Sequence, residues 1–354
     1  VTKYVHGLPN LAVGSKIAED EAVITQVAVE TGKPVSIDDI YTDERVDHEM
    51  MEKHGICAFM VVPIMLRGEA IGALSFSYYR AVTFTDEQID FASKLATAIS
   101  LALENSRLYT TERNIADTLQ EALLVLPSEV EGIDIDHFYQ SATDIFKVGG
   151  DFYDLFELEH DRVGIVIGDV SGKGLQAATL TSLVKNTIKA YAYESSSPAL
   201  VVSKTNEVTT KSSPAASFIT LFFGILDIGS GRLSYCSAGH PPPIVKRSGA
   251  ESSFLITRSP IIGAFTGLDY FDDIEVLAPN DILVLYTDGA TEARCDREFF
   301  GEERLRDTVQ KIAIPSAKGF PASIFNDIIG FACGRLPDDL AILVVSISTA
   351  SQID

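Results

Sequence analysis

The chain has 354 residues, of which 46% are apolar, and its formal net charge is −22. This length favours two domains over one, and the apolar content excludes a chain that is disordered throughout. The strong negative charge argues against nucleic acid as the main partner.

Residues 1 to about 90 mix helical and strand patterns, as is typical of a small α+β module. Apolar residues follow a helical spacing within 19–29. Residues 59–63 and 70–78 are predicted to form two strands joined by a short turn. This part of the chain is therefore predicted to fold as a domain of its own.

A long helix is predicted to start at Asp86, with Thr85 as its N-cap, and to continue to about Leu126, where Pro127 ends it. Along this helix, two sets of positions with a spacing of seven residues form two stripes, here called seams. One seam contains two polar residues. The seams are Leu101, Leu108, Ile115 and Ala122, and Asn105, Glu112, Leu119 and Leu126. Two interpretations stay open: a helix packed on its own domain, or a parallel coiled coil. The length of the helix favours the second, and with it a homodimer.

From residue 133 onward, strand patterns dominate and two helices interrupt them, at 175–193 and 197–210. Residues 218–226 and 232–237 are predicted to form a hairpin. Many of these strands are apolar on both faces, which indicates that both faces are covered. We expect antiparallel sheets with helices packed on them.

Four short segments place an aspartate beside glycine or at the end of an apolar strand. They are GGD at 149–151, GDVSG at 168–172, TDG at 287–289 and PDD at 337–339. Buried carboxylates are costly unless they are neutralised. Oxygen ligands without a histidine or cysteine cluster suit Mg²⁺ or Mn²⁺. The segments predict a metal-dependent hydrolase whose site is assembled from distant parts of one sheet, with Asp151, Asp169, Asp288 and Asp338 as candidate ligands.

The positions of two of these aspartates suggest that they share a sheet edge. Asp288 ends an apolar strand, whereas Asp338 lies just before another, at 340–347. In an antiparallel pair the end of one strand lies beside the start of its neighbour. The backbone carbonyl of Val170 is a further candidate ligand. A single Asp-Gly pair is better explained as a turn that caps its own backbone, but four such segments together are not.

Three further residues, in or near these and other conspicuous motifs, have roles that the sequence leaves open. Asp154 is either a group that supports the metal ligands or a surface residue. Asp339 is a candidate for hydrogen bonding to a ligand. His240, before a run of three prolines, is either structural or a general acid, and the structural role is favoured.

Two competing motifs are excluded by the residues themselves. Lys173 follows glycine as in a P-loop, but Ile167 stands where the first glycine belongs and Gly174 replaces Ser or Thr. A phosphorylated aspartate of the receiver type at Asp169 would need a parallel sheet, which the predicted hairpin contradicts.

Five motifs together resemble the bacterial PPM-type serine/threonine phosphatases of the SpoIIE/RsbU group. They are VGGDFYD at 148–154, GDVSGKG at 168–174, SAGHPPP at 237–243, LYTDG at 285–289 and LPDDLA at 336–341. Their order and spacing fit across about 130–350. Residues 1 to about 105 resemble the later part of a GAF sensor domain without its first strands. Because the chain also opens without an initiator methionine, we expect a longer parent protein or a trimmed form.

The resemblance implies an α+β chain in three parts: a GAF-like domain at 1–104, a helical coiled-coil linker at 105–128 and a PPM-type α-β-β-α sandwich at 129–354. It also implies a pair of Mn²⁺ or Mg²⁺ ions at one end of the sandwich. Asp151 and Asp169 would bridge or flank the ions, the carbonyl of Val170 would contribute, and Asp288 and Asp338 would complete the ligands.

The function implied by the resemblance is that of a metal-dependent protein-serine/threonine phosphatase. Its substrate would be a phosphorylated anti-anti-sigma (STAS) protein that controls a sigma factor, and the GAF–helix unit would regulate it, with a small molecule as a second candidate partner. Two alternatives are a pseudo-phosphatase that binds a partner without turnover and a small-molecule sensor. The first is disfavoured because no candidate ligand is missing.

Four cysteines are scattered along the chain, without a CxxC pair: Cys57, Cys236, Cys295 and Cys333. They predict neither a disulfide framework nor a zinc site. The sequence contains no apolar stretch long enough to span a bilayer and no signal peptide at its start. We therefore expect a cytoplasmic protein that does not act at a membrane.

Overall fold

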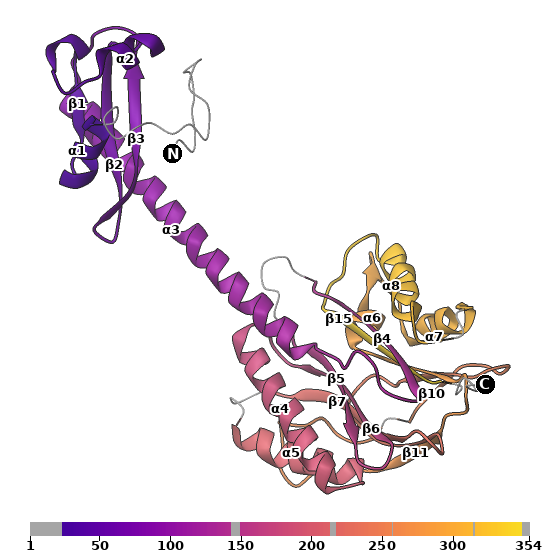
Figure 1. The fold of residues 1–354 in the computed structure, drawn as a ribbon. Coiled ribbons are helices and arrows are strands. Elements are labelled where there is room, and N and C mark those ends of the chain that lie inside the picture. Colours follow the sequence, from indigo (N-terminus) through magenta and orange to yellow (C-terminus); the bar gives the residue numbers. More distant parts are fainter. Residues whose placement is uncertain (1–22, 143–148, 213–216, 257, 314–315, 349–354) are drawn as a thin grey trace. The chain divides into compact units, whose positions relative to one another are not determined.

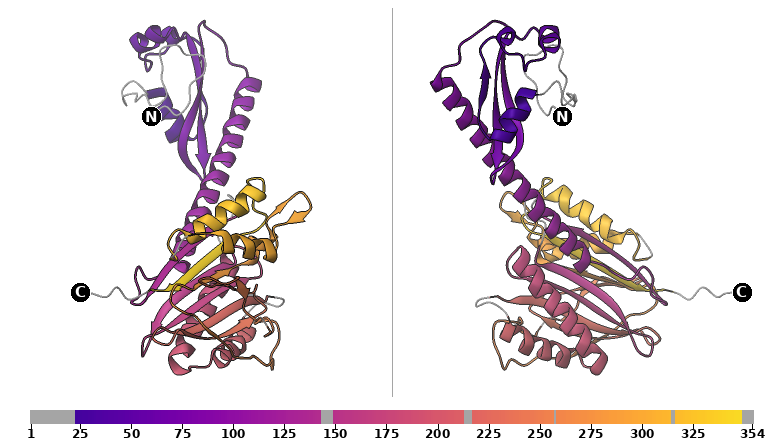
Figure 2. Two further views of the ribbon diagram at one scale, coloured as in Figure 1. Left: turned by 90° about the vertical axis from the view of Figure 1, so that its right-hand side faces the viewer. Right: turned by 60° about the vertical axis from the view of Figure 1, so that its left-hand side comes forward.

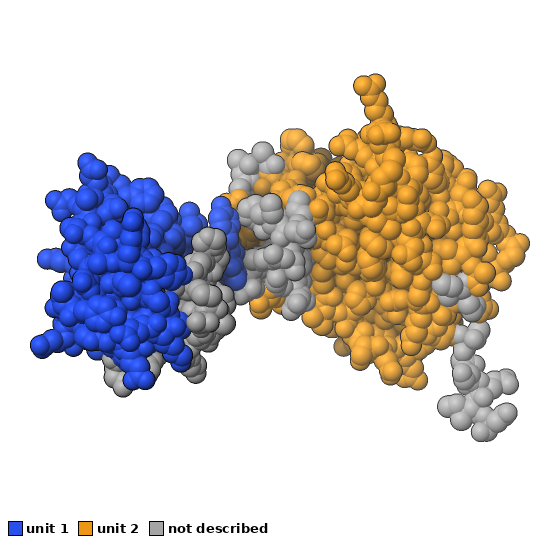
Figure 3. Space-filling view, turned by 90° about the horizontal axis from the view of Figure 1, so that it is seen from above, with its two compact units in different colours: residues 1–112 blue, residues 113–354 orange. Residues whose placement is uncertain are grey.

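A computed structural model describes residues 23–142, 149–212, 217–256, 258–313 and 316–348. The chain divides into two compact units, residues 1–112 and 113–354 (Figure 3). The division falls within the longest helix, α3 (Asp86–Leu123). Among the residues that the structure describes, no helix is long and apolar enough to cross a membrane.

The first unit is built on a three-stranded antiparallel sheet in the order β1-β2-β3 (Figure 1). Its elements are α1 (Val23–Thr31), β1 (Val35–Ile37), the 3-10 helix η2 (Ile40–Thr42), α2 (His48–His54), β2 (Ala58–Leu66) and β3 (Glu69–Tyr78). Alternate residues of β2 pack on opposite faces of the sheet. Phe59 and Val61 join the core that includes α1 and α2, whereas Met60 packs with Ala92 and Ala96 of α3. The predicted α+β module is confirmed; the part of the predicted first helix before Val23 lies outside the described residues.

Helix α3 starts where the sequence predicts and ends three residues early. Its N-terminus is a capping box, because the backbone N–H of Gln88 donates to Thr85 Oγ1 at 3.3 Å and Thr85 N–H donates to Gln88 Oε1 at 3.0 Å. The helix ends at Leu123, and Leu126 packs against the core of the second unit instead of continuing the seam. Proline disfavours a helical conformation in the preceding residue, so Pro127 explains this exit. The side chains of two other seam members, Glu112 and Leu119, lie outside the described part of the chain.

The second unit contains two five-stranded sheets, in the orders β10-β9-β12-β15-β4 and β11-β8-β7-β6-β5, with antiparallel pairing throughout. The strands of the first sheet are β4 (Ile133–Gln140), β9 (Ile244–Lys246), β10 (Ser253–Phe254), β12 (Ile282–Tyr286) and β15 (Leu340–Ile347). Those of the second sheet are β5 (Asp151–Leu158), β6 (Arg162–Val170), β7 (Ile219–Asp227), β8 (Arg232–Ala238) and β11 (Asp273–Val276). The remaining elements are α4 (Leu175–Glu194), α5 (Pro198–Ser212), α6 (Asp288–Glu292), β13 (Arg294–Cys295), β14 (Glu298–Phe299), α7 (Glu302–Lys311) and α8 (Phe320–Phe331).

The two sheets pack face to face, and a helical layer covers each outer face (Figures 1 and 2). Helices α4 and α5 cover the second sheet, and α7 and α8 cover the first. The predicted α-β-β-α sandwich is therefore confirmed. Strand β15 shows why its sequence is apolar on both faces: Ile342 packs towards α7 and α8, whereas Leu343 packs into the core between the sheets.

One cysteine pair contradicts the sequence prediction. Cys295 of β13 and Cys333, two residues after α8, form a disulfide although 38 positions separate them, with their Cα atoms 6.0 Å apart. The prediction that the cysteines form no disulfide framework is therefore wrong for this pair, whereas Cys57 and Cys236 are free. The end of α8 returns to the β13–β14 hairpin, and that return depends on tertiary packing rather than on cysteine spacing.

Candidate metal centre

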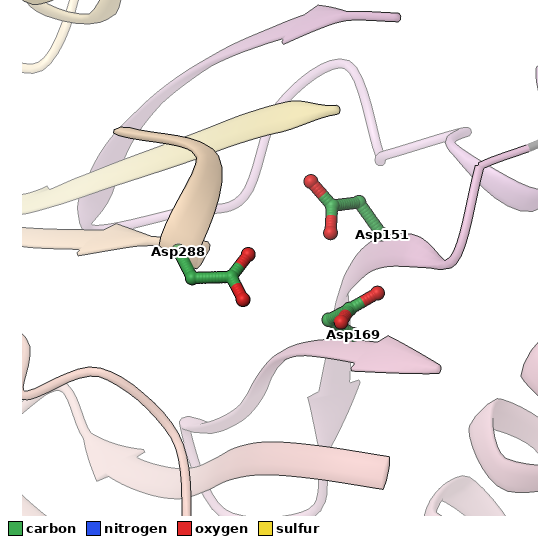
Figure 4. Close-up of side chains that lie close together, drawn as sticks. All are labelled: Asp151, Asp169 and Asp288. Carbon is green, nitrogen blue, oxygen red and sulfur yellow. The ribbon is translucent and has the colours of Figure 1, made fainter. Parts of the chain in front are cut away.

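Three predicted ligands converge at one end of the sandwich (Figure 4). Asp151 begins β5 and is paired in register with Asp169 near the end of β6. Asp288 is the first residue of α6, and only Thr287 separates it from Tyr286 at the end of β12. One carboxylate oxygen from each aspartate lies within 4.8 Å of the others. A cluster of this size can share divalent cations.

The cluster is assembled from both sheets, so the prediction of one sheet is wrong. Asp151 and Asp169 belong to the second sheet, whereas Asp288 follows a strand of the first. Strand patterns do not reveal which sheet a strand joins, because strands of both sheets, such as β6 and β12, are apolar on both faces. The predicted shared edge is confirmed: Tyr286 pairs with Ile342, which places the start of α6 beside the start of β15.

Thr287 connects the two sheets at this point, and sequence reasoning did not assign it a role. Its hydroxyl donates to Asp151 Oδ2 at 2.6 Å and accepts from the backbone N–H of Ala341 at 2.9 Å. The side chain is fully buried. Thr287 therefore orients Asp151 towards the cluster. The TDG motif contained this signal, but its threonine could be read only as part of a turn.

The pKa values of the three clustered carboxylates are raised, which indicates that their negative charges are not offset within the protein. Burial, and then the charge of Asp169, raises the pKa of Asp151 well above its ordinary value. Burial, followed by the charges of Asp288 and Asp338, raises the pKa of Asp169 to about 7. Burial also raises the pKa of Asp288. Several negative charges in one partly buried site are unfavourable until a cation offsets them, so these oxygen ligands fit Mn²⁺ or Mg²⁺.

The backbone next to Asp151 approaches the cluster so closely that it requires glycine. A Cβ atom on Gly150 would lie 2.1 Å from the carbonyl oxygen of Val170 and 2.4 Å from Asp169 Oδ1. The N–H of Val170 donates to the carbonyl of Gly150 at 3.1 Å. Any larger residue would displace this backbone. Glycine therefore leaves the Val170 carbonyl and the Asp169 carboxylate side by side, where both can hold the same cation.

Asp338 lies beside the cluster but outside the group of three. Its Oδ1 accepts from the ammonium of Lys173 at 2.7 Å. Its charge still raises the pKa of both Asp169 and Asp288, so it is close enough to contribute to the electrostatics of the centre.

Asp339 and Asp154 hold the surroundings of the centre in place. Asp339 is buried and accepts from Ser141 Oγ at 3.0 Å and from the N–H of Ala142 at 2.9 Å, which holds the segment after β4. Asp154 lies 3.4 Å from the ammonium of Lys185 on α4. That ammonium also donates to the carbonyl of Leu123, the last residue of α3.

His240 is almost fully buried, and its Nδ1 lies 3.1 Å from Thr220 Oγ1. Burial lowers the pKa of His240 to about 3, so the ring is neutral at pH 7. This position favours the structural role over that of a general acid.

A comparison with protein-family models gives two matches. The model described as Stage II sporulation protein E (SpoIIE) matches residues 159–348, which is more than half of the chain. The chain belongs to the SpoIIE family. A GAF-domain model matches residues 5–104. The chain therefore carries a phosphatase domain of the SpoIIE type together with a GAF domain. The first match confirms the resemblance predicted from the five motifs, and the second confirms the resemblance of residues 1 to about 105 to a GAF domain.

Two curated relatives illustrate this membership. Phosphoserine phosphatase RsbU of Bacillus subtilis is 28% identical over 239 residues, which cover 66% of this chain and 70% of RsbU. Protein IcfG of Synechocystis sp. is 32% identical over 229 residues, which cover 56% of this chain but only 36% of IcfG. The chain thus spans about a third of the length of IcfG.

Solved structures have the same fold in the SpoIIE-type domain. The RsbU and RsbW domains of a Mycobacterium tuberculosis protein match with a TM-score of 0.56 at 25% identity, covering 64% of this chain and 62% of that one. The PP2C phosphatase domain of SpoIIE from Bacillus subtilis matches with a TM-score of 0.55 at 18% identity, covering 61% and 63%.

Proposed function

We propose that this protein is a metal-dependent protein-serine/threonine phosphatase that acts on a phosphorylated STAS-type anti-anti-sigma protein. The observation that supports it is the cluster of Asp151, Asp169 and Asp288, which come from two sheets. The pKa values of all three carboxyl groups are raised. Membership in the SpoIIE family and similarity to a phosphoserine phosphatase support the reaction. The STAS substrate and the cytoplasmic location stay predictions from the sequence.

In this proposal, Asp151, Asp169, Asp288 and the carbonyl of Val170 would hold two Mn²⁺ or Mg²⁺ ions, with Asp338 as a further ligand. When bound, divalent cations make water more acidic and offset charge on phosphoryl oxygens. The residues of the chain supply the rest: Thr287 orients Asp151 by its hydrogen bond, and the glycine at 150 leaves room for the carbonyl. Water adds to phosphorus, the ester P–O bond breaks, and the products are serine hydroxyl and inorganic phosphate.

Phosphate release from a serine-phosphorylated STAS protein tests this function directly. The full chain is expected to release phosphate with Mn²⁺ or Mg²⁺ and to release none above the blank with EDTA, because the carboxylates alone repel the substrate. Restoring the cation after EDTA is expected to restore activity. A chain that binds the STAS protein but releases no phosphate under any of these conditions would instead be a pseudo-phosphatase.

We further propose that the GAF–helix unit controls the phosphatase domain and that α3 mediates a homodimer. Three seam residues of α3, Leu101, Leu108 and Ile115, are 54–58% exposed in the single chain, as expected for residues that pack on a second copy. The Leu123 carbonyl at the end of α3 accepts from Lys185, which also pairs with Asp154. A small molecule bound to the GAF domain is the proposed signal.

An insertion in α3 tests this control. Three or four extra residues after Thr110 shift the seam by half a heptad and are expected to change phosphatase activity severalfold in either direction. Seven extra residues keep the seam in register and serve as the matched control. Phosphate-release rates that are equal for both insertions and the unmodified chain would remove the linker mechanism.

A further inference from the structure

Lys173 sits in a loop whose shape is set by its neighbours. Gly172 and Gly174 have φ values of 106° and 84°, and a Cβ on either would meet nothing within 4 Å. The glycines are therefore needed for the backbone conformation and not for lack of space. Ser171 anchors the loop to the residue that precedes β7, because its N–H donates to the carbonyl of Phe218 at 2.9 Å and its hydroxyl accepts from Phe218 N–H at 2.8 Å.

This loop carries an ammonium group to the metal centre. Lys173 follows β6 of the second sheet, yet its Nζ lies 2.7 Å from Oδ1 of Asp338, just before β15 of the first sheet. Within the described ranges, no other lysine or arginine is ion-paired with Asp151, Asp169, Asp288 or Asp338. The Lys173 and Asp338 side chains are 42% and 45% exposed, so the pair lies where a substrate can reach it.

A simple explanation is that the pair holds the loop in place. An ion pair this exposed contributes little to stability, on the order of 0–1 kcal/mol. That contribution does not explain why two glycines with positive φ present a lysine to an acidic centre. A phosphoserine substrate carries up to two negative charges and must approach at least four carboxylates. A lysine at the mouth of the centre supplies the point charge that binds phosphate.

We propose that Lys173 is the phosphate-binding residue of this centre. It forms an ion pair with Asp338 in the absence of substrate and donates to a phosphoryl oxygen when substrate binds. Asp338 would then be free to coordinate the metal ions. This inference rests on the proposed phosphatase function and names the residue that recognises the phosphoryl group.

Binding of inorganic phosphate to the Mg²⁺-loaded full chain, measured by calorimetry, tests this role without relying on turnover. Lys173→Met is expected to weaken phosphate binding at least tenfold and to raise KM for the phosphorylated STAS protein. Lys173→Arg keeps the charge and is expected to stay within about threefold of the unmodified chain, since guanidinium also binds phosphate. Lys204→Met is the matched control, because Lys204 on α5 is 46% exposed and also ion-paired, with Glu207.

Two results would overturn the proposal. One is phosphate binding by Lys173→Met within threefold of the unmodified chain. The other is a loss of Mn²⁺ affinity in Lys173→Met with normal phosphate binding at saturating Mn²⁺, which would mean that Lys173 only positions Asp338. Failure of the phosphatase function has a different signature, since the unmodified chain would then release no phosphate although its phosphate binding could still be compared with that of the variants.

Discussion

Replacement of Asp288 by asparagine is expected to lower kcat of the Mn²⁺-loaded protein by roughly 10³-fold or more. A metal ion contributes several kcal/mol of charge stabilisation in the transition state, and each 1.36 kcal/mol corresponds to about a tenfold change in rate. Asparagine keeps the shape of the side chain but removes the charge that helps to hold the ion. The measurement is phosphate release from an aryl phosphate and from the STAS protein, over a range of Mn²⁺ concentrations.

The matched control for this variant is Asp296→Asn. Asp296 lies in the turn between β13 and β14, is exposed, and has a positive φ of 55° that asparagine tolerates. Its removal is expected to leave kcat unchanged. If Asp288→Asn retained a tenth or more of the normal kcat at saturating Mn²⁺, Asp288 would not be a ligand that the reaction requires.

Much of the phosphatase domain could be predicted because its strands are long and their sequences are unambiguous. Strand β15 has the predicted limits, residues 340–347. Its sequence is a nearly continuous apolar run that starts directly after the polar PDD segment. The shared sheet edge of Asp288 and Asp338 followed from antiparallel pairing alone. The family resemblance depended on motifs that combine glycine and aspartate, and these motifs mark backbone positions with special geometry.

The features that sequence reasoning missed depend on tertiary contacts. Thr287 links the sheets through the hydrogen bonds of its hydroxyl. The hydrophobic periodicity of a sequence does not indicate side-chain hydrogen bonds of this kind. The sheet to which β6 or β12 belongs and the pairing of Cys295 with Cys333 both follow from how elements pack. Lys173 was noticed only as part of a P-loop that does not exist; its reach to Asp338 depends on the path of the loop.

The metal-free protein is expected to lose stability as the pH rises from about 4 to about 7. Burial, and the charges of Asp288 and Asp338, raise the pKa of Asp169 from 3.8 to about 7 in the folded state. Between these two values the folded state binds more protons than the unfolded state, so the free energy of unfolding falls with increasing pH. Below pH 4 both states are protonated, and this contribution is fully present.

Thermal melting in EDTA at pH 5 and pH 7.5 measures this effect when the unmodified chain is compared with Asp169→Asn. Asparagine cannot ionise, so the variant is expected to gain more melting temperature over the unmodified chain at pH 7.5 than at pH 5. Each kcal/mol shifts the melting temperature by ~2–4 °C in a domain of this size. Saturating Mg²⁺ is expected to reverse the order at pH 7.5, because the ion binds only the complete set of ligands and stabilises the folded state. An equal difference between the two proteins at both pH values would contradict the raised pKa, and the centre would then not need a cation to offset its charge.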